Sequence, residues 1–223
     1  MSDTDSFIEE VTEEVRRDRL FLMLKRYGWI GGLAVVLIVG GAAFNEYNKS
    51  KQLAASQKLG DEMIAALSSD DEAGRADALA AISTETAGGS AILAMLQAGA
   101  LAETDKPEEA VARLQEVALN AELPLIYRHI ASFKALGLQQ DSLSIEERRL
   151  QFEALAQPGA PLSLLASEQL ALLDVEAGDV DAAIDRLKAI VEDAGVTADL
   201  KERATQVIVA LGGKLDEAEV SEG

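Results

Sequence analysis

Residues 27–44 read Tyr27-Gly-Trp-Ile-Gly-Gly-Leu-Ala-Val-Val-Leu-Ile-Val-Gly-Gly-Ala-Ala-Phe44, an apolar stretch of 18 residues without a charge. As an α-helix this stretch would cover about 27 Å, close to the thickness of the hydrocarbon core of a bilayer. Tyr27 and Trp29 stand at one end, and Phe44 and Tyr47 at the other, where aromatic rings prefer the headgroup level. The stretch therefore predicts a transmembrane helix anchored at both interfaces by these rings.

Two other interpretations of this stretch are weaker. A core helix of a soluble protein would be weakened by its five glycines, which are common in membrane helices. A cleaved signal peptide could use Gly41 and Ala43 as its small residues, but a charged leader of 26 residues is long for such a peptide. Gly28 and Gly32 have the spacing that lets two membrane helices approach closely, although glycine is frequent throughout this stretch.

The distribution of basic residues predicts the orientation of the helix. Five bases precede it within residues 1–26, whereas three lysines, Lys49, Lys51 and Lys58, follow it over a comparable length. Because cytoplasmic flanks carry the excess of lysine and arginine, we expect the N-terminus in the cytoplasm and the larger part outside. In a bacterium this means an inner-membrane protein with a periplasmic domain.

The chain thus divides into four segments. Residues 1–26 form a polar N-terminal segment, in part an amphipathic helix because Phe7, Val11 and Val15 are spaced four apart. Residues 27–44 form the membrane helix, and residues 45–213 form the main domain. Residues 214–223 form an acidic tail with little to bury, for which we expect disorder.

The main domain is predicted to be all-α. Apolar residues recur at helical spacing, as in Leu93, Leu96 and Ala100 and again in Leu114 and Ala118, and no stretch alternates with the period of a strand. Residues 105–114 also align with residues 178–187 at an offset of 73, which is two units of about 36 residues. We expect three helical hairpins over residues 88–120, 124–157 and 161–193, preceded by helices in 46–68 and 72–83 and closed by a helix over 198–211.

The hairpin pattern resembles the tetratricopeptide repeat. Asp105-Lys-Pro-Glu-Glu-Ala110 and Gly178-Asp-Val-Asp-Ala-Ala183 both place a turn before a helix with a small residue in its first turns. In that family the small residues let the two helices of a hairpin pack closely, and the matching positions here are Ala98, Ala110, Ala171 and Ala183. The large aromatics of the family are mostly absent. The resemblance implies an α-solenoid of helical hairpins.

Over the whole length the chain resembles the YfgM-like family of proteobacteria. The resemblance rests on Phe7-Ile-Glu-Glu-Val11, on Tyr27-Gly28, and on the order of N-terminal segment, single membrane helix and degenerate repeats. Members of that family are ancillary subunits of the Sec translocon. The resemblance implies association with the SecYEG channel, with a periplasmic chaperone and with newly translocated, unfolded protein clients.

The amino-acid composition argues against several classes of function. The net charge of −19 and the aromatic share of 4% disfavour nucleic-acid binding, and there is no cysteine to form a disulfide or a thiolate metal site. Pairs of acids such as Glu108-Glu109 and Glu146-Glu147 are interpreted as solvated first turns of helices. The single histidine, His129, is interpreted as a packed or surface residue on a helix that faces a groove.

The adjacent Arg148 and Arg149 are interpreted as an exposed basic face rather than an anion site. We expect no enzyme, no catalytic residue, no metal and no cofactor. Two functions remain. The first is a membrane-anchored scaffold that binds partner proteins, and the alternative is a membrane protein whose repeats and Gly28–Gly32 pair mediate self-association.

Overall fold

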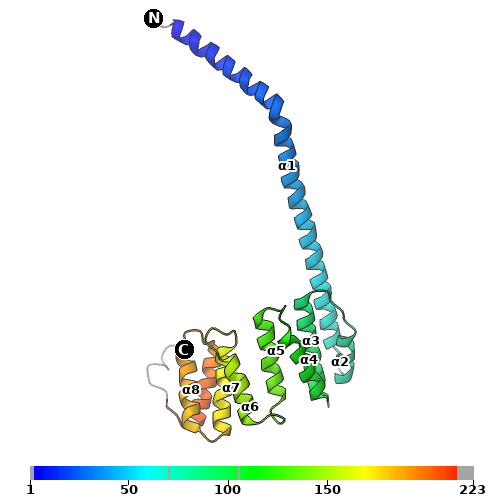
Figure 1. The fold of residues 1–223 in the computed structure, drawn as a ribbon, viewed down its shortest axis with the longest axis vertical. Coiled ribbons are helices and arrows are strands. Elements are labelled where there is room, and N and C mark those ends of the chain that lie inside the picture. The colour runs from blue at the N-terminus through cyan, green and yellow to red at the C-terminus, as the bar shows by residue number, and fades with distance from the viewer. Residues whose placement is uncertain (1–2, 70, 105, 215–223) are drawn as a thin grey trace. The chain divides into compact units, whose positions relative to one another are not determined.

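The computed structural model describes residues 3–69, 71–104 and 106–214, with side chains from residue 21 onwards except those of residues 22 and 24. These residues form nine α-helices and no strand, which confirms the all-α prediction for the described part of the chain (Figure 1). The helices are α1 (Asp3–Leu67), α2 (Glu72–Ala80), α3 (Ala87–Ala102), α4 (Pro107–Leu119), α5 (Leu125–Leu138), α6 (Ile145–Leu155), α7 (Ser163–Glu176), α8 (Val180–Glu192) and α9 (Ala198–Ala210).

Helix α1 is a single continuous helix of 65 residues. The changes of composition at residues 26/27 and 44/45 do not interrupt it, because this part of the chain holds no proline to break the hydrogen-bond ladder. Contacts divide the chain into two units, Met1–Lys58 and Leu59–Gly223, and the boundary between them lies within α1. The side chains of Phe7, Val11 and Val15, and the predicted tail beyond Lys214, lie outside the described residues.

A proline and a polar capping residue mark the starts of two of the later helices. Pro107 opens α4 at its first position, and the side chain of Asp179 accepts the backbone N–H of Ala182 to cap α8. Gly178, just after α7, has φ of 84°, a left-handed conformation that favours glycine at the end of a helix. Gly178 and Asp179 thus form a turn that closes α7 and caps α8, in agreement with the turn predicted before this helix.

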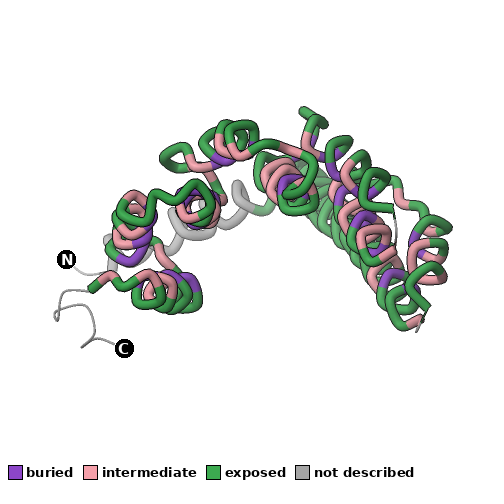
Figure 2. Tube along the Cα trace, turned by 90° about the horizontal axis from the view of Figure 1, so that it is seen from below, coloured by how far each residue is buried: buried purple, intermediate pink, exposed green. Residues whose placement is uncertain are grey.

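The described residues of the compact unit hold four hydrophobic clusters, each joining three consecutive helices. One cluster joins the end of α1 to α2 and α3, the next joins α3, α4 and α5, the third joins α5, α6 and α7, and the last joins α7, α8 and α9. Figure 2 shows the buried residues on the faces where neighbouring helices meet. Because α3, α5 and α7 are each shared between two successive clusters, the helices pack in chain order, and their outer faces stay open to solvent.

Candidate binding groove

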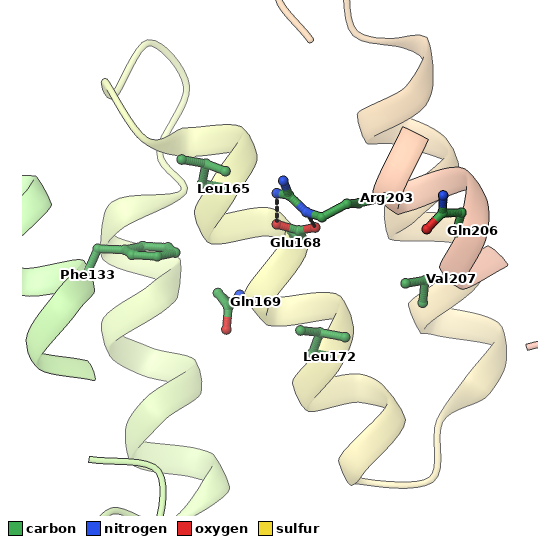
Figure 3. Close-up of a pocket in the computed structure, with 8 residues that line it drawn as sticks. All are labelled: Phe133, Leu165, Glu168, Gln169, Leu172, Arg203, Gln206 and Val207. Atoms are coloured by element: carbon green, nitrogen blue, oxygen red, sulfur yellow. Dashed lines mark hydrogen bonds and ion pairs between the residues drawn. The ribbon is translucent and has the colours of Figure 1, made fainter. Parts of the chain in front are cut away.

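An open groove of about 500 Å³ lies over α5, α7 and α9. Figure 3 shows the side chains of its walls, with α7 between α5 and α9. One residue comes from α5, four from α7 and three from α9: Phe133, Leu165, Glu168, Gln169, Leu172, Arg203, Gln206 and Val207. The sequence places the α7 residues on one face, because they follow one another at intervals of three, one and three residues, which is the spacing of one side of a helix.

Apolar side chains make up much of the groove surface. Leu172 is 41% exposed although it lies on a helix whose other face is packed in two clusters. Phe133 is half-buried and is held by an edge-to-face contact with Phe152 of α6, at 5.7 Å between ring centroids. The groove therefore offers apolar surface on fixed helices rather than on loops.

A paired charge crosses the groove from α7 to α9. The guanidinium of Arg203 donates to both carboxylate oxygens of Glu168, from Nε at 2.9 Å and from Nη2 at 2.8 Å. Hydrogen bonding to Glu168 raises the pKa of Arg203, which is charged in any case. The bidentate pair, drawn in Figure 3, fixes the spacing of the two helices along the groove.

A second, smaller cavity of about 120 Å³ shares Gln169 and Leu172 with the groove and extends toward α6. It includes Arg148, whose Nη2 lies 2.5 Å from Oε1 of Glu176 at the end of α7. This second cavity is lined by polar and apolar side chains alike, so the mainly apolar lining of the groove does not extend into it.

Helix α7 carries buried acids that tie it to both of its neighbours. The side chain of Asp174 is 5% exposed and accepts hydrogen bonds from Arg149 of α6 at 2.6 Å and from Arg186 of α8 at 3.0 Å. The interpretation of Arg148 and Arg149 as an exposed basic face was wrong, since Arg148 is buried and both are paired with α7. The reason is that carboxylates 25 and 28 residues further along the chain meet them in the folded state.

The remaining predicted residues lie as follows. Glu108 and Glu109 are in the first turn of α4, and Glu146 and Glu147 are in that of α6, as expected. His129 is half-buried on α5 and does not line the groove, and its Nδ1 is buried without a hydrogen-bond partner.

The four alanines named from the repeat pattern are all fully buried: Ala98, Ala110, Ala171 and Ala183. Ala98 and Ala110 lie in one cluster between α3 and α4, while Ala171 and Ala183 lie on α7 and α8. At these four positions a methyl group is the whole buried side chain, so the helix backbones can approach closely there.

The residues named as membrane anchors are all exposed on α1: Tyr27, Trp29, Phe44 and Tyr47. Cations stand over two of these rings, with Arg26 at 5.9 Å from the centre of Tyr27 and Lys51 at 5.2 Å from that of Tyr47.

The Gly28–Gly32 pair lies on α1 between these rings. Added Cβ atoms at the two glycines would meet no atom within 4 Å.

The apolar part of α1 is the one helix among the described residues that is long and apolar enough to cross a membrane. None of its most apolar window is buried within the structure.

Sequence reasoning did not identify the groove residues as a set. One signal was present: Glu168 lies on the same face of α7 as Leu165 and Leu172, so a charge interrupts an apolar face. Such a charge indicates a partner on another helix but does not say which one.

The described residues contain no cluster of three His, Asp or Glu side chains close enough to hold a metal ion. No family model, curated protein or solved structure matches the chain. The chemistry of the groove is therefore the main basis for a function, and this chemistry suits binding of an apolar segment.

Proposed function

We propose that this protein is a membrane-anchored scaffold that binds other proteins. In this proposal residues 27–44 of α1 cross a bilayer, and the helices that follow form a tetratricopeptide-repeat-like solenoid. The observation that carries the proposal is the open groove over α5, α7 and α9, with Leu172 exposed in it. An open apolar surface on rigid helices suits an extended or helical segment of a partner better than a small enclosed substrate.

The solenoid is supported by the serial clusters and by the buried alanines. Ala98 and Ala171, like Ala110 and Ala183, are 73 residues apart and fully buried at equivalent places in two hairpins. A small residue at each place allows two helices to approach closely, which is how stacked hairpins build a continuous binding surface.

Membrane anchoring is supported by the exposure of the apolar part of α1. A stretch as apolar as residues 27–44 is costly to leave in water, and its flanking rings and cations suit the two interfaces of a bilayer. The excess of bases before the stretch favours a cytoplasmic N-terminus and a periplasmic groove. Tethering would keep the groove at a high local concentration beside other proteins of the same membrane.

The resemblance to the YfgM-like family gives the proposal its particular form. We infer an ancillary subunit of the Sec translocon in the bacterial inner membrane, which links the channel to a periplasmic chaperone and to newly translocated chains.

The test is site-specific photo-crosslinking in native membranes. A photo-reactive amino acid replaces Leu172 in the groove or, as a matched control, Leu150, an exposed leucine of α6 that does not line the groove. We expect translocon subunits or a periplasmic chaperone to crosslink from position 172 and not from position 150.

If crosslinks form only between copies of the chain, the scaffold function is contradicted and the alternative, a self-associating membrane protein, takes its place. Equal crosslinking from both positions would remove the groove from the proposal.

A further inference from the structure

We propose that the groove over α5, α7 and α9 selects a polypeptide segment that is both apolar and basic. A leucine-like side chain of the partner lies against Leu172 and Val207, and a lysine or arginine of the same segment lies at the N-terminal end of α9. This inference rests on the proposed function, because it names the chemistry of the partner that the same groove binds.

The apolar half of the selection follows from the groove surface. Leu172 of α7 and Val207 of α9 both line the groove, and Leu172 is left exposed. A partner side chain that covers this surface removes apolar area from water, which is favourable for any hydrophobic residue of suitable size. The apolar contact alone would not distinguish one apolar segment from another.

The basic half follows from the charges of α9 next to the groove. Asp199 lies four residues before Arg203, on the same face of α9, and it contributes with Glu168 to raising the pKa of Arg203. Glu202 lies four residues before Gln206 and accepts a hydrogen bond from its Nε2 at 3.1 Å. Three carboxylates therefore accompany one guanidinium at this end of the groove.

Helical spacing keeps the nearest lysine of α9 away from this cluster. Lys201 is two residues from both Asp199 and Arg203, which places it on the other side of the helix. The end of the groove at the start of α9 thus carries an excess of negative charge, and a cation of the partner would complement it. An acidic segment or an anionic lipid headgroup would be repelled there.

The charge of the whole domain acts in the same direction. Residues 45–223 contain 32 acids and 15 bases, so basic segments are attracted from a distance while acidic ones are repelled. The local cluster then determines where the cation lies relative to the apolar contact, and the combination selects segments in which the two side-chain types are close in sequence.

The experiment measures peptide binding to the full-length chain in nanodiscs of zwitterionic lipid, with empty nanodiscs as the background. The probe is a short fluorescein-labelled peptide in which leucine, lysine and alanine repeat. A second peptide carries glutamate in place of lysine, and a third carries serine in place of leucine. We expect only the first peptide to bind well, with weaker binding at high salt.

Two variants test where the cation lies. Asp199→Asn with Glu202→Gln removes two charges beside the groove, while Asp185→Asn with Glu192→Gln removes two charges from α8, which does not line it. We expect the first pair to weaken binding of the lysine peptide about three- to tenfold at low salt, and the second pair to have little effect, because exposed charge pairs contribute modestly and locally.

A third comparison separates this inference from the proposed function. Leu172→Ser should weaken binding of the lysine peptide, and Leu150→Ser should not. If the lysine and glutamate peptides bind equally and both depend on Leu172, the selection for basic segments is overturned while the groove remains a binding site. If the two pairs of charge variants weaken binding equally, the attraction is general and the local cation site is overturned. Absence of binding by every peptide also overturns the inference, and crosslinking from position 172 then reports separately on the groove.

Discussion

Removing the carboxylate of Asp174 tests whether its ion pairs with α6 and α8 stabilise the position of α7. The side chain of Asp174 is buried and accepts one hydrogen bond from Arg149 and one from Arg186. A hydrogen bond to a charged group contributes about 1.5–3 kcal/mol to stability. Since both arginines are about one third exposed and can regain water, we take the lower value for each, and Asp174→Ala should cost about 3 kcal/mol.

The assay is urea unfolding of the full-length chain in detergent micelles, followed by far-ultraviolet circular dichroism. A loss of about 3 kcal/mol is a large part of the 5–15 kcal/mol that typically stabilises a domain. Asp185→Ala is the matched control, because Asp185 is an exposed acid of α8 and should change stability by no more than about 0.5 kcal/mol. If Asp174→Ala and Asp185→Ala have the same free energy of unfolding, the reasoning is refuted.

A triple variant identifies the cause of the loss. Replacing Arg149 and Arg186 by methionine together with Asp174→Leu removes the buried carboxylate and both guanidinium groups that pair with it. Such a replacement is often neutral or stabilising, because no charge is left without a partner in the interior. Stability close to that of the wild-type chain would show that the single variant suffers from its unpaired arginines, and stability as low as that of Asp174→Ala would assign the loss to packing instead.

Three further predictions concern the rest of the compact unit. Leu114→Ala should cost about 2–5 kcal/mol in urea unfolding, because Leu114 is fully buried in the cluster of α3, α4 and α5. Leu119→Ala, at the end of the same helix, should cost less than about 0.5 kcal/mol because Leu119 is 79% exposed. Equal losses from the two substitutions would contradict the burial of Leu114 in this cluster. Gly178→Ala should lower the free energy of unfolding by about 1–2 kcal/mol, because alanine is strained at the φ of 84°, and an unchanged urea midpoint would disprove this. Hydrogen bonds from the backbone N–H and the side chain of Ser144 hold the pKa of Glu147 below its ordinary 4.5. The stabilisation that this carboxylate provides is therefore present above pH 4.5 and is lost as the pH falls through the lowered pKa. The difference in urea midpoint between the wild-type chain and Glu147→Gln should accordingly shrink from neutral pH to about pH 3, and a constant difference would show that the carboxylate charge is not involved.

The sequence alone determined which segments of the compact unit are helical and, at several of them, where the helix begins, although the helix expected in 46–68 is continuous with the apolar stretch in α1. Pro107, Ser144 and Asp179 begin helices through their own backbone or through hydrogen bonds within three residues, and Gly178 ends one through its own φ. The apolar spacing that predicts these helices is equally local, as is the uncharged run of residues 27–44. All of these signals act over one or two turns of chain, so a linear sequence contains them in full.

Only the tertiary structure decided the partners of the charges and the position of the groove. Arg203 meets Glu168 across 35 residues and Arg149 meets Asp174 across 25, and the spacing of residues within one helix does not reveal either pair. The interpretation of Arg149 as exposed was wrong for this reason. The groove arises in the same way, because Leu172 and Val207 line one surface only after α7 and α9 have packed. A face of one helix is fixed by its own periodicity, whereas a surface shared between helices depends on how the helices pack against one another in three dimensions.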